Sequence, residues 1–431
     1  MNYRQIINGE DKSLLAASAR AMLAAVRPLY ALGVAWKNRK YDRRGGVHAD
    51  VPTISIGNLT LGGTGKTPMV IWLAGKLQEQ NRRVAILSRG YHAKQQARAR
   101  AKSAGGTASQ VEGDFSLRGV SEGTLQAGTD FPLEGMSEET PLEETAQAGG
   151  APAKSQVAGT PSETSPLAPF PLNDEGLEIQ RRLPGVVQLQ QPDRVASARR
   201  AVAEFGSEVL VLDDGFQHRR LHRDVDIVLM DATQPFGVNG KLFPSGTLRE
   251  PLKSLRRADG IVLTRADFLT ADERAALKSR IFTEQGLGPD VFWAECRLRP
   301  VCFENPAGEA LPLNAFEGKR VGACCGIGNP EAFFSMLEGL GISLDRKNGK
   351  NIRTFPDHFA YGECGRLEMS HWRKTENLEA ILCTVKDIVK ISQATMDDLP
   401  PFFALRTELE FLAGEEALFH CLRRNVPTLF S

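Results

Sequence analysis

Residues 54–68 read ISIGNLTLGGTGKTP, and this stretch determines how the rest of the chain can fold. Short β-branched residues run into a glycine-rich turn, after which Gly65, Lys66 and Thr67 begin a segment with apolar residues at helical spacing. Strand, glycine-rich loop and helix in this order predict a phosphate-binding loop, whose backbone N–H groups turn towards phosphate oxygens. The side chains fit this role, since a lysine supplies positive charge to the terminal phosphates and a threonine hydroxyl can bind Mg²⁺.

The loop departs from the G-x-x-x-x-G-K-[ST] pattern at one position, because Thr60 stands where the first glycine is expected. Two later glycines restore the freedom that the backbone needs to wrap a phosphate. An accidental Gly-Lys-Thr in an ordinary turn is the plain alternative, and the strand before it and the helix after it argue against that. We predict that the nucleotide contacts Thr60, Leu61, Gly62, Gly63, Thr64, Gly65, Lys66 and Thr67.

A second, acidic motif lies at residues 209–218, which read VLVLDDGFQH. A run of buried-type residues that closes on two aspartates is typical of a Walker-B strand, where a carboxylate holds Mg²⁺ or its water shell. We therefore predict that Thr67, Asp213 and Asp214 bind the metal. Arg89 follows a predicted strand at 83–87, a place where ligands collect in open α/β sheets, although a lone arginine in a loop is more often a surface residue.

Further strands are predicted at 226–231 and 260–264, with helical patterns between the strands. This alternation indicates a P-loop NTPase-type, mostly parallel sheet with helices on both faces, in the α/β class. A second, smaller α/β lobe without a phosphate loop is predicted to begin near residue 301. We expect a hinge after about residue 300 and a separate sheet in each lobe. The predicted division is an N-terminal helix at 1–46, a phosphate-loop domain at 47–300 and the smaller lobe at 301–431.

Residues 93–172 interrupt the phosphate-loop domain with a different composition. They are dominated by Ala, Gly, Ser, Thr, Pro, Gln and Glu, and they contain no Ile, Tyr or Trp. Such a segment cannot bury enough apolar area to offset the entropy lost on ordering. We predict a low-complexity, disordered insertion in a loop and assign it no role.

The N-terminal segment from Leu14 to Trp36 is mostly apolar, but Arg20 and Arg27 interrupt it, so a bilayer-spanning helix is not expected. A basic and aromatic edge follows, made of Trp36, Lys37, Arg39, Lys40, Arg43 and Arg44. This pattern suits an amphipathic helix that lies in the headgroup region of an anionic membrane. An ordinary helix packed on the domain, with a solvated basic face, explains the pattern equally well.

Composition limits the possible partners of this 431-residue chain. The formal net charge is +1, which gives no reason to expect a nucleic acid partner. The seven cysteines are odd in number and form no Cys-x-x-Cys pair, so buried free thiols in a reducing compartment are expected, without disulfides or a zinc site.

Five motifs carry a resemblance to a known family: GNLTLGGTGKTP at 57–68, SRGY at 88–91, DDGFQHR at 213–219, LREPL at 248–252 and FPDH at 355–358. Together they closely resemble tetraacyldisaccharide 4'-kinase, the lipid A 4'-kinase family of Gram-negative envelopes. The resemblance covers nearly the whole chain except the insertion. The DDGFQH run is far more specific than the phosphate loop.

The resemblance implies an enzyme with ATP and Mg²⁺ as cofactors. Its activity would be the transfer of the ATP γ-phosphate to the 4'-hydroxyl of a tetraacylated glucosamine disaccharide 1-phosphate, which gives lipid IVA in lipid A biosynthesis. The expected partners are this acylated disaccharide lipid and the cytoplasmic face of the inner membrane, where the protein would be peripheral. No obligate protein partner is inferred.

The resemblance also implies catalytic roles for Asp174 and His358. In the family, a catalytic aspartate of a Gly-Asp-Glu-Pro motif works with the histidine of Phe-Pro-Asp-His; here residues 173–176 read NDEG, shortly before PDR at 192–194. An alcohol nucleophile at neutral pH needs a base within reach, which agrees with these roles. The expected contacts to substrate or phosphate are Arg89, Glu175, His218 and Arg249.

Two other classes of protein stay open on the sequence. A P-loop GTPase or assembly NTPase at the membrane is favoured by TRAD at 264–267, which resembles the Thr-Lys-x-Asp motif that reads guanine, with Arg265 in place of the lysine. A membrane scaffold that has kept only the nucleotide fold is opposed by the intact Lys66, Thr67 and aspartate pair.

Overall fold

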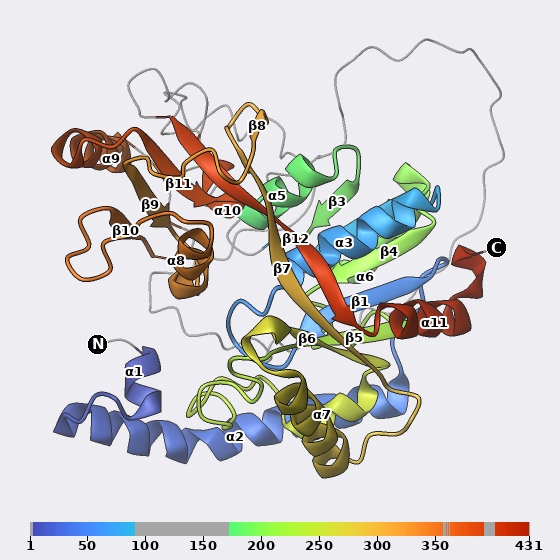
Figure 1. The fold of residues 1–431 in the computed structure, drawn as a ribbon. Helices are drawn as coiled ribbons and strands as arrows, with labels where there is room; N and C mark the ends of the chain where they lie inside the picture. Colours follow the sequence, from blue (N-terminus) through green and yellow to red (C-terminus); the bar gives the residue numbers. More distant parts are fainter. Residues whose placement is uncertain are drawn as a thin grey trace, which may run out of the picture.

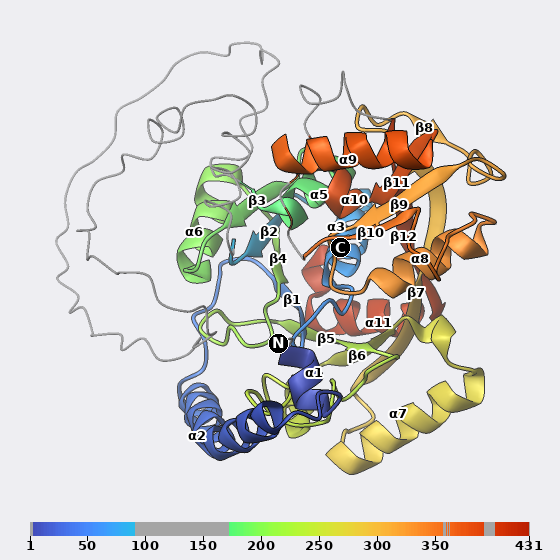
Figure 2. The ribbon, with the colours of Figure 1, turned by 90° about the vertical axis from the view of Figure 1, so that its left-hand side faces the viewer.

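The computed structural model describes residues 3–90, 172–356, 359, 361, 363–391 and 401–430. The predicted insertion at 93–172 therefore lies outside the described residues, except for Leu172. The same holds for the predicted catalytic residue His358. Figure 1 shows the arrangement of the described elements, and Figure 2 shows the same ribbon turned by 90°.

A parallel half-sheet forms the centre of the first lobe, in the spatial order β6-β5-β1-β4-β2-β3. Almost every strand residue in it is buried, as expected for a sheet covered on both faces. The strands are β1 (Thr53–Asn58), β2 (Val84–Ser88), β3 (Val187–Gln190), β4 (Val209–Asp213), β5 (Val225–Asp231) and β6 (Gly260–Thr264). All of these except β3 were predicted as strands.

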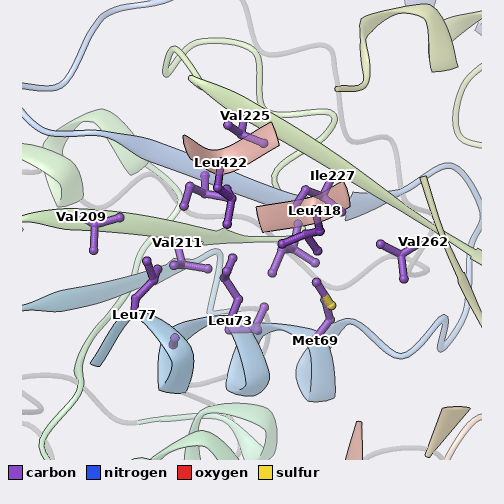
Figure 3. Packing of buried hydrophobic residues seen from close by; sticks show 14 of the residues in the cluster. Met69, Leu73, Leu77, Val209, Val211, Val225, Ile227, Val262, Leu418 and Leu422 are labelled. Atoms are coloured by element: carbon purple, nitrogen blue, oxygen red, sulfur yellow. The ribbon is translucent and has the colours of Figure 1, made fainter. Parts of the chain in front are cut away.

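Helices cover the two faces of this half-sheet. On one face, α3 (Lys66–Glu79), α5 (Asp174–Arg182) and α11 (Glu415–Asn425) pack against alternate residues of β1 and β4. Figure 3 shows Leu73 of α3 and Leu418 of α11 in this one cluster. The other face is covered by α6 (Arg194–Phe205), α7 (Ala271–Gln285) and the short 3-10 helices η2 (Leu252–Arg257) and η3 (Ala266–Phe268). The predicted α/β class, with helices on both faces, is confirmed.

The smaller lobe repeats this layering on the strands β9 (Val321–Cys325), β10 (Ile352–Thr354) and β11 (Ala380–Thr384), which pair in parallel. One face packs against α8 (Pro330–Gly339), the other against α9 (Glu363–Glu376) and α10 (Val385–Ile388). The 3-10 turn η5 (Pro427–Leu429) follows α11.

Two long strands, β7 (Phe292–Glu304) and β12 (Phe402–Ala413), join the lobes into one 12-stranded sheet. They pair antiparallel from Ala404 opposite Glu304 to Ala413 opposite Glu295, and the short β8 (Ala310–Leu311) adds to β7. Both strands run through the middle of the molecule in Figure 1. The expectation of a separate sheet in each lobe is therefore wrong.

The proposed domain boundary at residue 300 falls inside β7, a strand that serves both lobes. The chain also returns to the first lobe at its end, because Leu418 and Leu422 of α11 lie in the same core cluster as β1 and α3. The division into 47–300 and 301–431 remains our proposal for the two lobes, with α11 as the part of the second segment that packs on the first lobe.

The N-terminal helix α2 (Leu14–Arg44) follows the short α1 (Tyr3–Asn8) and lies at the opposite end of the molecule from α9 (Figures 1 and 2). Its ends are defined by Ser13, whose side chain caps the first turn, and by Gly45, where φ is 69°. No described helix combines the length and the apolar content needed to cross a membrane.

Candidate active site

The phosphate loop lies at the carboxyl edge of the sheet, between β1 and α3. Glycines occupy the positions that need a left-handed backbone, with φ of 123° at Gly62 and 81° at Gly65. Thr60 instead forms an antiparallel bridge with Leu248. Because this bridge needs only extended backbone, no glycine is required at residue 60, which explains the departure from the usual pattern.

The ends of β1 and β4 bring the loop and the acidic pair together, since Ile56 lies opposite Asp213 in the parallel register. The Nζ atom of Lys66 lies 3.4 Å from Oδ1 of Asp214 and 3.4 Å from Oδ1 of Asn58. Arg249 donates from Nη1 to Oδ2 of Asp214 at 2.7 Å. Burial alone would raise the pKa of Asp214, but Lys66 and Arg249 outweigh it and hold that pKa well below its ordinary value.

Asp213 has the opposite electrostatic environment. Burial raises the pKa of its carboxyl to about 7, and the charge of Glu175 adds to this effect while Lys66 opposes it. Its Oδ1 atom is buried and has no hydrogen-bond partner among the described residues. A buried carboxylate oxygen that lacks a donor is suited to a divalent cation.

The residues present therefore fit a magnesium ion. Asp213, Asp214 and the hydroxyl of Thr67, one position after Lys66 in the first turn of α3, supply the oxygen ligands that Mg²⁺ prefers. In the described part of the chain, no group of three or more His, Cys, Asp or Glu could enclose a metal by itself. An ion held here would take its remaining ligands from water and nucleotide phosphates, as is usual for Mg²⁺ in P-loop proteins.

Asp174 begins helix α5 and is completely buried, with 0% of the residue exposed. The N-cap Asn173 accepts from the Gly176 N–H at 2.9 Å and also from Nε2 of Gln190 at 2.9 Å. A Cβ atom at Gly176 would lie 2.4 Å from that Nε2 atom. The glycine that replaces the proline of the family motif therefore lets Gln190, at the end of β3, approach the first turn of α5.

The described site residues meet at one edge of the sheet. Glu175 lies close enough to Asp213 to raise its pKa. His218 has its pKa lowered to about 3, first by burial and then by the charges of Arg194 and of Lys37 from α2. Arg89 directly follows β2 and is exposed. The structure thus brings the phosphate loop, the aspartate pair and α5 together, while His358 lies outside the described residues.

Sequence reasoning missed several residues that support the site. Arg194, buried in α6, donates to the Asp213 carbonyl at 3.5 Å, and the PDR motif that contains it was the available signal. Arg265 pairs with Asp231 and donates to the Gly63 carbonyl at 3.0 Å, so the arginine of the TRAD motif supports the phosphate loop. No local pattern indicated the contacts of Lys386 and Lys390 with α5.

A phosphate loop, a Walker-B aspartate pair and a separate buried aspartate at one sheet edge define a P-loop phosphotransferase. The comparisons with known proteins name the family: the model for tetraacyldisaccharide-1-P 4'-kinase matches residues 19–117 and 155–426, and the chain belongs to this family.

The curated relatives have the same name, and their matches to this chain cover nearly their whole length. The tetraacyldisaccharide 4'-kinase of Geobacter sulfurreducens is 33% identical over 413 residues, with 94% of each chain covered. That of Anaeromyxobacter sp. (strain K) is 35% identical over 412 residues, with 94% of this chain and 90% of the relative covered. The predicted family and enzyme class are confirmed, and no match supports the GTPase alternative better.

A solved structure agrees with the fold. The "apo" form of LpxK from Aquifex aeolicus in complex with ATP is 26% identical, covers 94% of this chain and 99% of its own, and superimposes with a TM-score of 0.59.

Proposed function

We propose that the protein transfers the γ-phosphate of ATP to the 4'-hydroxyl of a tetraacylated glucosamine disaccharide 1-phosphate and thereby forms lipid IVA. One observation carries this proposal: a completely buried aspartate, Asp174, lies at the same sheet edge as Lys66 and the aspartate pair. A hydrolase needs only to position water. A kinase that activates an alcohol needs a base beside the phosphate site.

In the proposed reaction, the 4'-oxygen forms a bond to the γ-phosphorus, the bond from phosphorus to the ADP oxygen breaks, and the hydroxyl proton passes to Asp174. Residues 60–67 hold the phosphates. A magnesium ion on Thr67, Asp213 and Asp214 would neutralise charge on the transferring group. Arg249, now paired with Asp214, has a guanidinium at the place where phosphate charge would arrive.

We further propose that His358 acts with Asp174, and that Arg89, Glu175 and His218 contact the substrate. The uncharged state of the His218 ring, which follows from its lowered pKa, suits a hydrogen bond to a sugar hydroxyl. The support for His358 is the family motif alone. Phe355, the first residue of this motif, lies within the described residues, and the N–H of Phe355 donates to the Cys325 carbonyl at the end of β9.

The proposed place of action is the cytoplasmic face of the inner membrane, with α2 as the membrane contact. Seven large apolar side chains of α2 are exposed, at spacings that put them on one helix face: Leu14, Leu15, Met22, Val26, Leu29, Leu32 and Trp36. The basic end of the helix follows them. An apolar stripe with a basic end fits an anionic interface better than it fits water.

The contacts of α2 support a direct connection to the site. The Tyr30 hydroxyl donates to the Arg249 carbonyl at 2.9 Å, and Nδ2 of Asn38 donates to Oε2 of Glu250 at 2.9 Å. A helix in the membrane surface would thus hold the segment of Arg249 close to the headgroups that carry the acceptor hydroxyl.

The test is transfer of labelled γ-phosphate from ATP, or from GTP, to the disaccharide lipid in detergent micelles. We expect the parent protein to transfer phosphate from ATP. Asp174→Ala should lose turnover by about 10²–10⁴-fold and keep its affinity for ATP. Lys66→Ala should lose both turnover and affinity for ATP. The exposed Asp272→Ala on α7 is the matched control and should behave as the parent. Absence of lipid phosphorylation by a protein that binds ATP would refute the proposal, and full activity of Asp174→Ala would remove Asp174 as the base.

A further inference from the structure

Two lysines of the smaller lobe approach Asp174 where α10 packs against α5. Lys386 in α10 and Lys390 just after it each place Nζ 3.9 Å from Oδ2 of Asp174. All three side chains are removed from solvent, with 17%, 6% and 1% exposed, respectively. We call Lys386 and Lys390 the cross-lobe lysines, because α5 belongs to the first lobe and α10 to the second.

The cross-lobe lysines are themselves held in place. Lys390 lies 3.1 Å from Oδ1 of Asp387, which is completely buried and accepts from the Gly326 N–H at 3.1 Å and from the Thr384 hydroxyl at 2.6 Å. Its ammonium lies 5.6 Å from the centre of the Tyr361 ring. Lys386 lies 3.5 Å from Oε1 of Glu175. The charge of Lys390 is therefore held by the smaller lobe, whereas the charge of Lys386 is held beside Asp174 by Glu175 of α5.

The burial of Asp174 makes these charges significant for its chemistry. A carboxyl group without solvent favours its neutral form, and a neutral acid cannot accept a proton from an alcohol. A positive charge within about 4–6 Å favours the carboxylate. In this structure the two lysines supply such charge, and they do so only where α10 lies against α5.

We propose that Lys386 and Lys390 are positioning residues that keep Asp174 ionised, and thus able to act as a base, when the smaller lobe lies against α5. The inference rests on the proposed function, because it takes Asp174 as the base. It adds a condition to that function: the base becomes competent only through a contact between lobes.

The effects of other charged groups near Asp174 must be distinguished from the effect of the two lysines. Glu175 and Glu178 share α5 with it, and Asp387 faces it from α10 behind Lys390. Glu178 has its pKa raised to about 7, chiefly by burial and against the charge of Lys386. Because loss of Lys386 would also favour protonation of Glu178, the experiment is carried out in parallel in a Glu178→Gln background.

The experiment measures kcat and the KM for ATP between pH 6 and pH 9.5 in Lys386→Met, Lys390→Met and the double variant. We expect kcat at pH 7 to fall about 10- to 100-fold, with the KM for ATP unchanged, and to recover most of this loss towards pH 9, because a higher pH favours the ionised form of any carboxyl group. Lys386→Arg and Lys390→Arg, which keep the charge, should follow the parent profile. Lys374→Met, an exposed lysine on α9, is the matched control.

A loss of equal size at every pH would show that the lysines only dock the lobes, and an unchanged profile would show that they do not act on Asp174; either result overturns the inference. If Lys390→Met does not fold, Lys386→Met, which is less buried, still decides between these outcomes. Asp174→Asn distinguishes failure of the proposed function from failure of the further inference. If it is active, the proposed base is wrong. If it is inactive while the lysine variants show no pH-dependent recovery, only the further inference fails.

Discussion

The exposed apolar face of α2 leads to a quantitative prediction for membrane binding. Leu29 and Leu32 are 70% and 66% exposed. Full burial of a leucine side chain contributes about 1.5–3 kcal/mol, so about two thirds of this, or about 1–2 kcal/mol for each residue, is available to a membrane. Replacing both by glutamine, which keeps helix propensity, should therefore weaken binding by about 2–4 kcal/mol, or about 30- to 700-fold in the partition coefficient.

The assay is co-sedimentation with vesicles that contain anionic phosphatidylglycerol, at increasing lipid concentration, with ATP affinity measured on the same samples. The matched control is Leu367→Gln, because this leucine of α9 is 67% exposed but lies at the other end of the molecule. We expect ATP affinity to be unchanged in both proteins. Parental partitioning of Leu29→Gln/Leu32→Gln, or an equal loss in Leu367→Gln, would refute the assignment of α2 as the membrane contact.

Three further predictions concern the sheet edge. The pKa of Asp213 in the folded protein, about 7, lies above its ordinary value of 3.8. Between these values the folded state holds a proton that the unfolded state has lost, so the free energy of unfolding should fall as pH rises from about 4 to about 7. Asp213→Asn should flatten this slope in thermal melts recorded across that range. Arg265→Ala removes the support of the Gly63 carbonyl and should weaken ATP binding about 3- to 10-fold by calorimetry; unchanged affinity would show that the loop holds its shape alone. Gly57→Ala puts a Cβ atom 2.5 Å from Cβ of Phe216 and should lower the free energy of unfolding by about 1–3 kcal/mol in urea titrations, whereas Gly33→Ala on the open side of α2 should not.

Local patterns were sufficient to predict the phosphate loop, the strand before it and the helix after it. Each depends on neighbours in the chain: glycines where φ is positive, apolar residues at helical spacing in α3, and a buried run that ends in Asp213. The strand at 209–213 and the acidic pair after it were found for the same reason. The edge at which the two motifs meet follows from the parallel order of β1 and β4.

The joining of the lobes could not be predicted from local patterns. The middle of β7 contains Arg297 and Arg299, charges that do not suggest a strand through the centre of a protein. Their partners are on β12, where Glu410 accepts from Arg297 across a separation of 113 residues. Opposite charges on neighbouring strands stabilise a sheet only after both strands have met, so neither strand shows the pattern alone.

The candidate active site, too, could be predicted from local patterns only in part. Asp174 was predicted through a family motif, while Lys386 belongs to a helix of four residues in the other lobe and Lys390 follows that helix. Residues 385–390, which read VKDIVK, have no feature that distinguishes them from an exposed turn. Only the packing of α10 against α5 turns two lysines into neighbours of a buried carboxylate.

The position of α11 has a consequence for the synthesis of the protein. Leu418 and Leu422 are completely buried among residues of β1, β4 and α3 (Figure 3), so the core of the first lobe is complete only after α11 has been made. Until then, a growing chain that already carries every residue of the phosphate loop exposes the apolar surface that α11 will cover, and such surface invites aggregation. A chain interrupted before residue 415 is therefore expected to leave this part of the core open, and we expect chaperones to bind the growing chain until α11 has been made.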